Sequence, residues 1–130
     1  MPHLILEYSS NLDGAVDFAA LTKVIHATLL ETGLFELGAV RVRAFRSEAY
    51  AIGDLLPGNG FIDMSFRLGE GRTAAERKST GDRVFEAVNA FLAGKVNPLQ
   101  FALSFEVREI DRELSWKRNG MHARLREPES

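Results

Sequence analysis

Hydrophobic and polar positions follow two different periods along this chain, and the two periods predict strands and helices. Four short runs are rich in aliphatic and aromatic side chains and are bounded by turn-forming residues, which is typical of strands. These runs are residues 3–8, 39–45, 61–68 and 101–107. In the second run apolar and basic side chains alternate, so Arg41 and Arg43 are expected on one face of that strand and Val40 and Val42 on the other.

Two further segments repeat apolar side chains at helical spacing. The first covers about residues 15–32 and is followed by Gly33, and the second ends at Gly94, where glycine suits a left-handed helix terminator. The second helix is expected to begin at Thr73 and Glu76, which have the spacing of a capping box. Its predicted apolar stripe is Val84, Phe85, Val88, Phe91 and Leu92.

The order strand, helix, strand occurs twice, over about residues 2–46 and 60–108. We therefore predict one α+β domain over residues 1–130, in which two tandem β-α-β units form a four-stranded sheet with both helices on one face. Residues 111–130, which include the single tryptophan, Trp116, are expected to form a C-terminal arm against the body or a neighbour. The last four residues, 127–130, are expected to be frayed.

No predicted helix covers the second face of this sheet. We expect large apolar side chains on that face, among them Phe61, Phe66, Phe101 and Phe105. Burial of such a face requires partner chains, and a closed cyclic assembly satisfies this requirement.

Composition excludes several classes of function. The chain has 130 residues and no cysteine, which excludes disulfides and thiolate chemistry. A formal net charge of -2 provides no field that would collect nucleic acid or an anionic membrane. His3, His26 and His122 lie far apart, so no metal site is predicted. The chain has neither a leader pattern nor an apolar run that could span a bilayer, and we expect a cytoplasmic protein.

The start of the chain carries the first candidate for chemistry. Aminopeptidase action on a chain that opens Met1-Pro2 is expected to leave Pro2 as a free secondary amine. Such an amine serves as a base if its pKa falls toward neutrality, and the apolar residues 4–6 favour this by desolvating the ammonium form. The alternative is that Pro2 follows Met1 by chance and has no function.

Arginines are the second candidates. Arg41 and Arg43 lie on the predicted second strand, and Arg72 lies in the turn before the second helix. Planar guanidinium groups bind carboxylates through two parallel hydrogen bonds. The alternative, which is the common fate of arginine, is a solvated surface position.

Taken together, these segments resemble the tautomerase superfamily, and within it the 5-carboxymethyl-2-hydroxymuconate isomerases. The resemblance covers nearly the whole chain in order. Its second half also resembles the single-unit relative 4-oxalocrotonate tautomerase. The residues that carry the resemblance are Pro2-His3, 32–35, 40–43, 69–72, 102–106 and His122-Ala123.

The resemblance implies one site per chain, because Pro2 and Arg41 lie in the first unit and Arg72 in the second. It implies that a dienol with three carboxylates is converted to its 2-oxo-3-ene isomer in the catabolism of homoprotocatechuate-type aromatic compounds. Pro2 is then the general acid and base, Arg41 and Arg72 bind the substrate and stabilise negative charge, and Arg43 is a lesser candidate for a carboxylate. It further implies no cofactor, no metal, a small carboxylate substrate and a homotrimer.

The other side chains considered have weaker assignments. We interpret His3 as a packing or supporting group, and neither His26 nor His122 has a catalytic partner in the sequence. Phe45 and Tyr50 are candidates for the pocket wall or for the core. Two alternative functions stay open: another tautomerase-superfamily activity on a small keto acid, and a non-catalytic trimeric ligand-binding domain.

Overall fold

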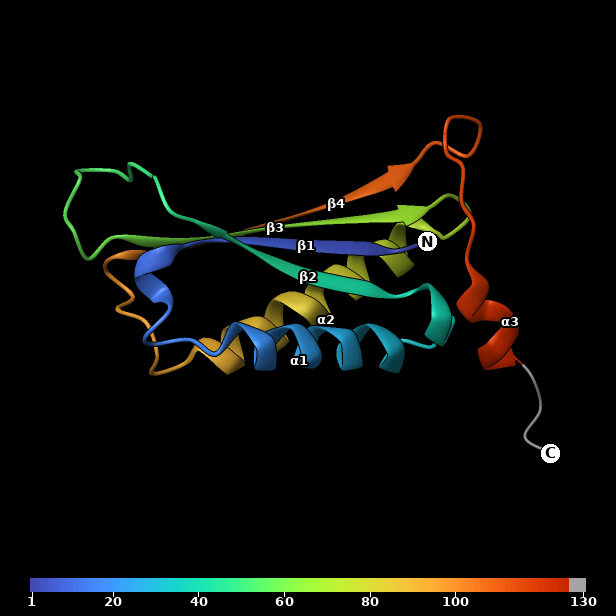
Figure 1. Ribbon diagram of the computed structural model, residues 1–130, viewed down its shortest axis with the longest axis horizontal. Coiled ribbons are helices and arrows are strands. Elements are labelled where there is room, and N and C mark those ends of the chain that lie inside the picture. The colour runs from blue at the N-terminus through green and yellow to red at the C-terminus, as the bar shows by residue number, and fades with distance from the viewer. Residues whose placement is uncertain (127–130) are drawn as a thin grey trace.

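A computed structural model describes residues 1–126 of the chain, and the expectation of a frayed end at 127–130 lies outside these residues. A four-stranded sheet forms one layer, and the two long helices α1 and α2 form the other (Figure 1). The elements in chain order are β1 (His3–Ser9), η1 (Ser10–Leu12), α1 (Phe18–Glu31), η2 (Leu37–Ala39), β2 (Arg41–Ser47), β3 (Gly60–Gly69), α2 (Ala74–Leu92), β4 (Phe101–Ile110) and α3 (Gly120–Arg126). None of these helices is long and apolar enough to cross a membrane.

The strand order is β2-β1-β3-β4. Strand β1 runs parallel to β2, β3 runs parallel to β4, and β1 and β3 pair in antiparallel orientation at the centre of the sheet. Each β-α-β unit therefore contributes one parallel pair of strands. This arrangement confirms the predicted α+β fold with both long helices on one face.

The helix ends follow from local chemistry. Helix α2 begins with the predicted capping box, because the Thr73 hydroxyl accepts from the Glu76 backbone N–H at 3.0 Å and the Thr73 N–H donates to the Glu76 carboxylate at 2.9 Å. Gly33 and Gly94 have positive φ angles of 73° and 76°, as a left-handed helix terminator requires. Helix α1 begins three residues later than predicted, because the Asp17 carboxylate accepts from the Ala20 N–H and caps the helix there.

The core lies between the sheet and the two long helices. It is built from alternate positions of β1 and β3 and from one stripe of each helix. Its fully buried members include Leu4, Leu6, Leu21, Ile25, Leu29, Ile62, Met64, Phe66, Leu68, Val84 and Val88. Phe85, which we expected in the stripe of α2, is 40% exposed; it follows the buried Val84 by one position, which turns it about 100° around the helix from Val84.

The open face of the sheet differs from our expectation. Phe66 is fully buried on the helix side, and Phe101 and Phe105 also pack against the core, so of the four expected phenylalanines only Phe61 lies on the open face. The physical reason is the period of two along a strand, which separates Phe61 from Phe66. The open face is mostly polar: His3, Ile5, Glu7, Arg41, Arg43, Phe45, Phe61, Asp63, Ser65, Arg67, Ala102, Ser104, Glu106 and Arg108. An apolar face that demands burial is therefore not a reason for assembly.

The stability of the fold should depend on the buried positions of β1. We expect Leu6→Ala to lower the free energy of unfolding by about 3–5 kcal/mol, because it leaves a cavity at a position with 0% exposure. Leu99→Ala, at a position that is 93% exposed, serves as the matched control and should change it by less than about 0.5 kcal/mol. Urea unfolding followed by circular dichroism measures both values, and equal effects would contradict this description of the core.

Candidate functional site

Pairing of strands β1 and β2 brings the start of the chain next to Arg41. Pro2 is buried immediately before β1, and its carbonyl accepts a hydrogen bond of 3.2 Å from the Arg41 backbone N–H. The register then sets His3 opposite Arg41 on the same face of the sheet. Pro2, immediately before β1, therefore lies beside Arg41 at the start of β2, so two of the residues predicted for the site are neighbours.

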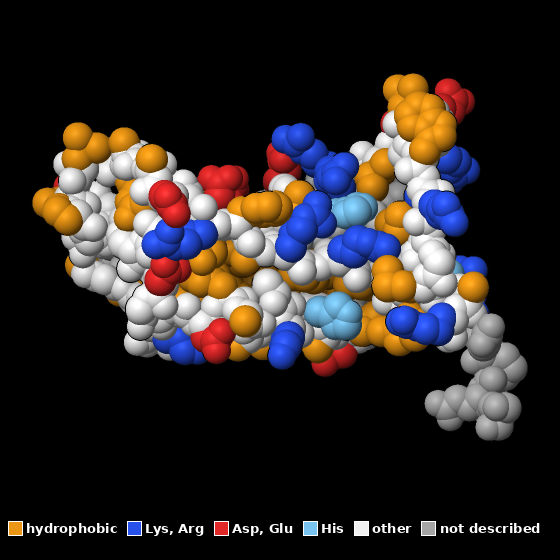
Figure 2. All heavy atoms as spheres, viewed as in Figure 1, with side chains coloured by type: hydrophobic (Ala, Val, Ile, Leu, Met, Phe, Trp, Pro, Cys, Tyr) orange, Lys and Arg blue, Asp and Glu red, His pale blue; other side chains and the backbone are white. Residues whose placement is uncertain are grey.

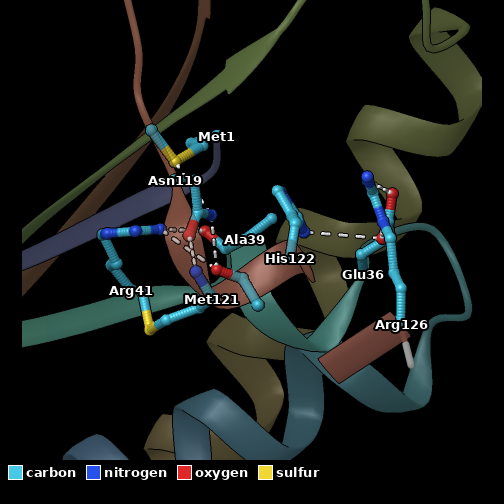
Figure 3. A network of polar contacts seen from close by, with 9 residues as sticks. Met1, Glu36, Ala39, Arg41, Asn119, Met121, His122 and Arg126 are labelled. Atoms are coloured by element: carbon cyan, nitrogen blue, oxygen red, sulfur yellow. Dashed lines mark hydrogen bonds and ion pairs between the residues drawn. The ribbon is translucent and has the colours of Figure 1, made fainter. Parts of the chain in front are cut away.

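The guanidinium group of Arg41 is held by the short turn that precedes its strand. Its Nη1 donates to the Ala39 carbonyl at 2.8 Å and lies 3.5 Å from the Gly38 carbonyl (Figure 3). Both acceptors belong to η2. These bonds fix the orientation of the planar group, and other N–H groups of the guanidinium remain for a ligand.

Arg72 joins two loops that are distant in sequence. Its Nη2 donates to the Leu34 carbonyl at 2.9 Å, and its Nη1 donates to the Gly69 carbonyl at 3.3 Å. The guanidinium carbon lies 4.6 Å from the centre of the Phe35 ring, within the range of a cation–π interaction. Arg72 is therefore not a solvated surface residue. Of its five N–H groups, two donate to these carbonyls.

Electrostatics links the start of the chain to both arginines. Burial lowers the pKa of the Met1 amino group, and the positive charges of Lys117, Arg72 and Arg41 lower it further. Each of these charges disfavours a second positive charge nearby. The structure thus brings the predicted arginines of both units to one chain end.

A pocket of about 380 Å³ opens at this end of the sheet. The strands contribute one wall, and the segment that follows β4 contributes the other. The lining residues are Met1, His3, Arg67, Gly69, Glu70, Ile110, Arg112, Leu114, Ser115, Trp116 and Lys117. Because Met1 lines the pocket and is bonded to the nitrogen of Pro2, a chain without Met1 presents the Pro2 amine at this pocket.

The C-terminal arm is anchored to the body of the same chain, beside this pocket. The Asn119 side-chain amide donates to the Gly38 carbonyl at 2.8 Å and lies 3.4 Å from the Met1 sulfur. His122 and Arg126 both approach the Glu36 carboxylate, with Nδ1 of His122 at 3.5 Å (Figure 3).

Gly38 permits the close approach of helix α3 to the body. A Cβ atom at Gly38 would lie 3.2 Å from His122 Nδ1 and 3.3 Å from its backbone nitrogen. These distances are shorter than ordinary van der Waals contacts, so a side chain at this position would push α3 away from η2.

His3, which we interpreted as a packing or supporting group, has a polar contact beside the pocket. It lies on the open face, lines the pocket, and its Nδ1 is 3.3 Å from Nη1 of Arg43. Burial lowers the pKa of His3, and the charges of Arg67, Arg43, Arg41 and the N-terminal amine lower it further. Sequence reasoning did not consider Arg67, which lies on the same face of β3 as Phe61 and lines the pocket. Its position six residues after Phe61 in a predicted strand is the signal that assigns it to this face.

Other predicted residues lie elsewhere. Phe45 is opposite Glu7, toward the far end of β1, and neither it nor Tyr50 lines the pocket. Tyr50 instead packs edge-on against Phe61, with ring centroids 6.4 Å apart. His26 lies on α1, in the helix layer. Within residues 1–126, no group of three or more His, Asp and Glu side chains is placed to hold a metal ion.

Positive charge is concentrated around the site. Figure 2 shows Lys and Arg side chains gathered over the half of the molecule in which the N-terminus lies. Arg41, Arg43 and Arg67 all project from the open face near His3. Such a cluster attracts small anions and suits a substrate that carries several carboxylates.

Comparison with known proteins gives a consistent result. Residues 2–125 match the family model described as 5-carboxymethyl-2-hydroxymuconate isomerase, so the match begins at Pro2. A 5-carboxymethyl-2-hydroxymuconate Delta-isomerase of Escherichia coli is 31% identical over 95% of this chain and 98% of its own length. A 5-carboxymethyl-2-hydroxymuconate isomerase from Deinococcus radiodurans R1, solved by crystallography, is 33% identical over 97% of this chain and 95% of that chain, with a TM-score of 0.89.

More distant structures share the fold alone. A wild-type fused 4-OT, solved as a symmetric trimer, has a TM-score of 0.70 at 14% identity, over 89% of this chain and 93% of that chain. This fold is therefore shared with a protein whose sequence is only 14% identical to this chain.

Proposed function

The chain belongs to the 5-carboxymethyl-2-hydroxymuconate isomerase family, and on this basis we propose that it converts 5-carboxymethyl-2-hydroxymuconate to its 2-oxo-3-ene isomer. The reaction belongs to the catabolism of homoprotocatechuate-type aromatic compounds. It moves one proton and needs no cofactor. The observation that carries the proposal is the position of the chain start: Met1 lines a pocket together with Arg67, Arg112 and Lys117, and burial lowers the pKa of its amino group.

The reaction is a ketonisation. A base removes the proton from the 2-hydroxyl group, and the electrons of the O–H bond form the C2=O double bond. The C2=C3 electron pair moves to C3–C4, and the former C4=C5 pair accepts a proton at C5. One group that first takes and then returns the proton suits this reaction, because there is no net change in protonation.

We assign this group to Pro2. Its nitrogen is free once Met1 is removed, and it lies one residue from the Met1 amine, whose pKa is lowered by burial and by the charges of Lys117, Arg72 and Arg41. A neutral amine at physiological pH has a lone pair for the 2-hydroxyl proton. Removal of the initiator methionine takes place where the chain is synthesised, which accords with a cytoplasmic location.

Arg41 and Arg72 have the second role in the proposal. Each bonds backbone carbonyls through its terminal nitrogens and is thereby oriented before substrate arrives. Their remaining N–H groups bind substrate carboxylates and stabilise the negative charge that develops on the 2-oxygen as its proton leaves. Arg43 remains a lesser candidate for carboxylate binding, because it contacts His3.

The proline assignment predicts that turnover depends on a free Pro2 amine. Pro2→Ala should lower kcat by at least about 100-fold, because it replaces the rigid secondary amine of the acid–base group. Pro98→Ala, at an exposed proline far from the pocket, is the matched control and should retain full activity. Turnover is followed by ultraviolet absorbance of the dienol.

The same assignment predicts that Met1 must be absent. A preparation whose intact mass shows retained Met1 should have the circular dichroism of the mature chain but no activity, since an amide nitrogen has no usable lone pair. Wild-type turnover by chains that retain Met1 would contradict the role of Pro2.

The arginine assignment predicts a change in pH dependence. Kcat/KM of the wild type should rise with pH through an amine pKa below the ordinary α-amino value. Arg41→Gln and Arg72→Gln remove a positive charge, which favours the protonated amine, so the rise should move to higher pH and kcat should fall by about 100-fold. Arg46→Gln, on the same strand as Arg41 but paired with Asp13 and Glu48, should leave the profile unchanged. An unchanged profile in all three variants would contradict the assignment.

We also propose a homotrimer. The support is the fold shared with a fused 4-OT that forms a symmetric trimer. Native mass spectrometry should therefore give three times the mass of the chain. A monomer at micromolar concentration would contradict this proposal without affecting the assignments of Pro2 and the arginines.

A further inference from the structure

The pocket beside Met1 has more positive charge than the proposed mechanism uses. Arg67, Arg112 and Lys117 line it, and Glu70 is the one carboxylate in its lining. That carboxylate already accepts a hydrogen bond of 3.3 Å from the Arg112 backbone N–H. The pocket is therefore suited to an anionic group, and none of its cations is one of the two arginines assigned above.

Two of the lining residues are positioned by the rigid centre of the sheet. His3 on β1 and Arg67 on β3 are directly opposite each other in the antiparallel pairing, on the open face. Side chains at such positions have Cβ atoms about 5 Å apart. A single carboxylate can therefore contact both side chains. Arg112 and Lys117, in contrast, lie in the segment after β4.

The contact with Arg43 fixes the chemical form of His3. Arginine has only hydrogen-bond donors, so the imidazole Nδ1 at 3.3 Å from Arg43 Nη1 must be the acceptor. His3 is then neutral and has its hydrogen on Nε2. The lowered pKa of His3 agrees with this form. His3 and Arg67 therefore both offer hydrogen-bond donors to a ligand, His3 through Nε2 and Arg67 through its guanidinium group.

We infer that His3 and Arg67 form a carboxylate subsite separate from Arg41 and Arg72, and that it binds the carboxymethyl group of the substrate. This inference rests on the proposed function. The substrate has three carboxylates, as its name states, and Arg41 and Arg72 account for two. A volume of about 380 Å³ is within the usual range for small-molecule sites and accommodates the carboxymethyl arm.

The decisive experiment compares two substrates that differ only by the carboxymethyl group. Arg67→Gln should raise KM for 5-carboxymethyl-2-hydroxymuconate by about tenfold to 100-fold, the usual effect of losing a charge-assisted hydrogen bond. KM for 2-hydroxymuconate should change by less than about twofold. Arg108→Gln is the matched control, because Arg108 is opposite Arg67 on the same face but pairs with Glu106 and does not line the pocket.

Variants of His3 test the donor. His3→Gln keeps an N–H near the position of Nε2 and a carbonyl acceptor for Arg43, so it should retain most of the preference for the larger substrate. His3→Leu has neither group, so its preference for the larger substrate should fall by about tenfold. The ¹⁵N chemical shifts of the His3 imidazole should show hydrogen on Nε2 and not on Nδ1. Hydrogen on Nδ1 would overturn the inference.

Binding separates this inference from the proposed function. Isothermal calorimetry measures the affinity of the protein for two simple carboxylates. Arg67→Gln should weaken binding of tricarballylate, which has three carboxylates, by tenfold or more, and binding of glutarate, which has two, by less than twofold. This result would support the subsite even if the wild type failed to isomerise the dienol. Equal losses for both ligands, or equal changes in KM for both substrates, would overturn it.

Discussion

Pairing of β1 on both of its edges is the constraint on which the site depends. The first strand of a chain is commonly frayed unless it is tied into a sheet, and here β1 occupies the centre between β2 and β3. Leu4 and Leu6 of β1 are fully buried in the core, and the Arg41 N–H donates to the Pro2 carbonyl. The start of the chain is thereby tied into the sheet. Acid–base chemistry at a terminal amine requires this, because the amine must keep a fixed distance from its substrate.

The positive charge of the site has an energetic cost that the fold offsets. Arg41 and Arg43 on β2 and Arg67 on β3 project from the same face of the sheet on either side of β1, and like charges close together repel one another. Hydrogen bonds from Arg41 and Arg72 to backbone carbonyls offset part of this repulsion. Arg43 likewise donates to His3, which is neutral. An anionic ligand relieves the remainder.

Local signals predicted the elements well, while the neighbours of each site residue depended on strand pairing. The capping box of Thr73 and the glycine terminator at Gly33 act within a few residues, so their outcome could be read from the sequence. The face on which Phe66 lies depends on the strand's pleat relative to the helices, and a shift of one position reverses it. His3 and Arg67 become neighbours only through the β1–β3 register, which spans more than sixty residues of sequence. The docking of α3 on η2 likewise joins distant segments that have no shared local pattern.

The contact between Asn119 and Met1 has a consequence for how the chain matures. Asn119 lies 3.4 Å from the Met1 sulfur and also bonds Gly38, so the folded arm holds the very residue whose removal frees Pro2. Until Asn119 has been translated this contact cannot form, so the arm does not hold Met1 during synthesis. Because Met1 is at the start of the chain and Asn119 is near its end, an aminopeptidase can reach Met1 before the C-terminal arm contacts it.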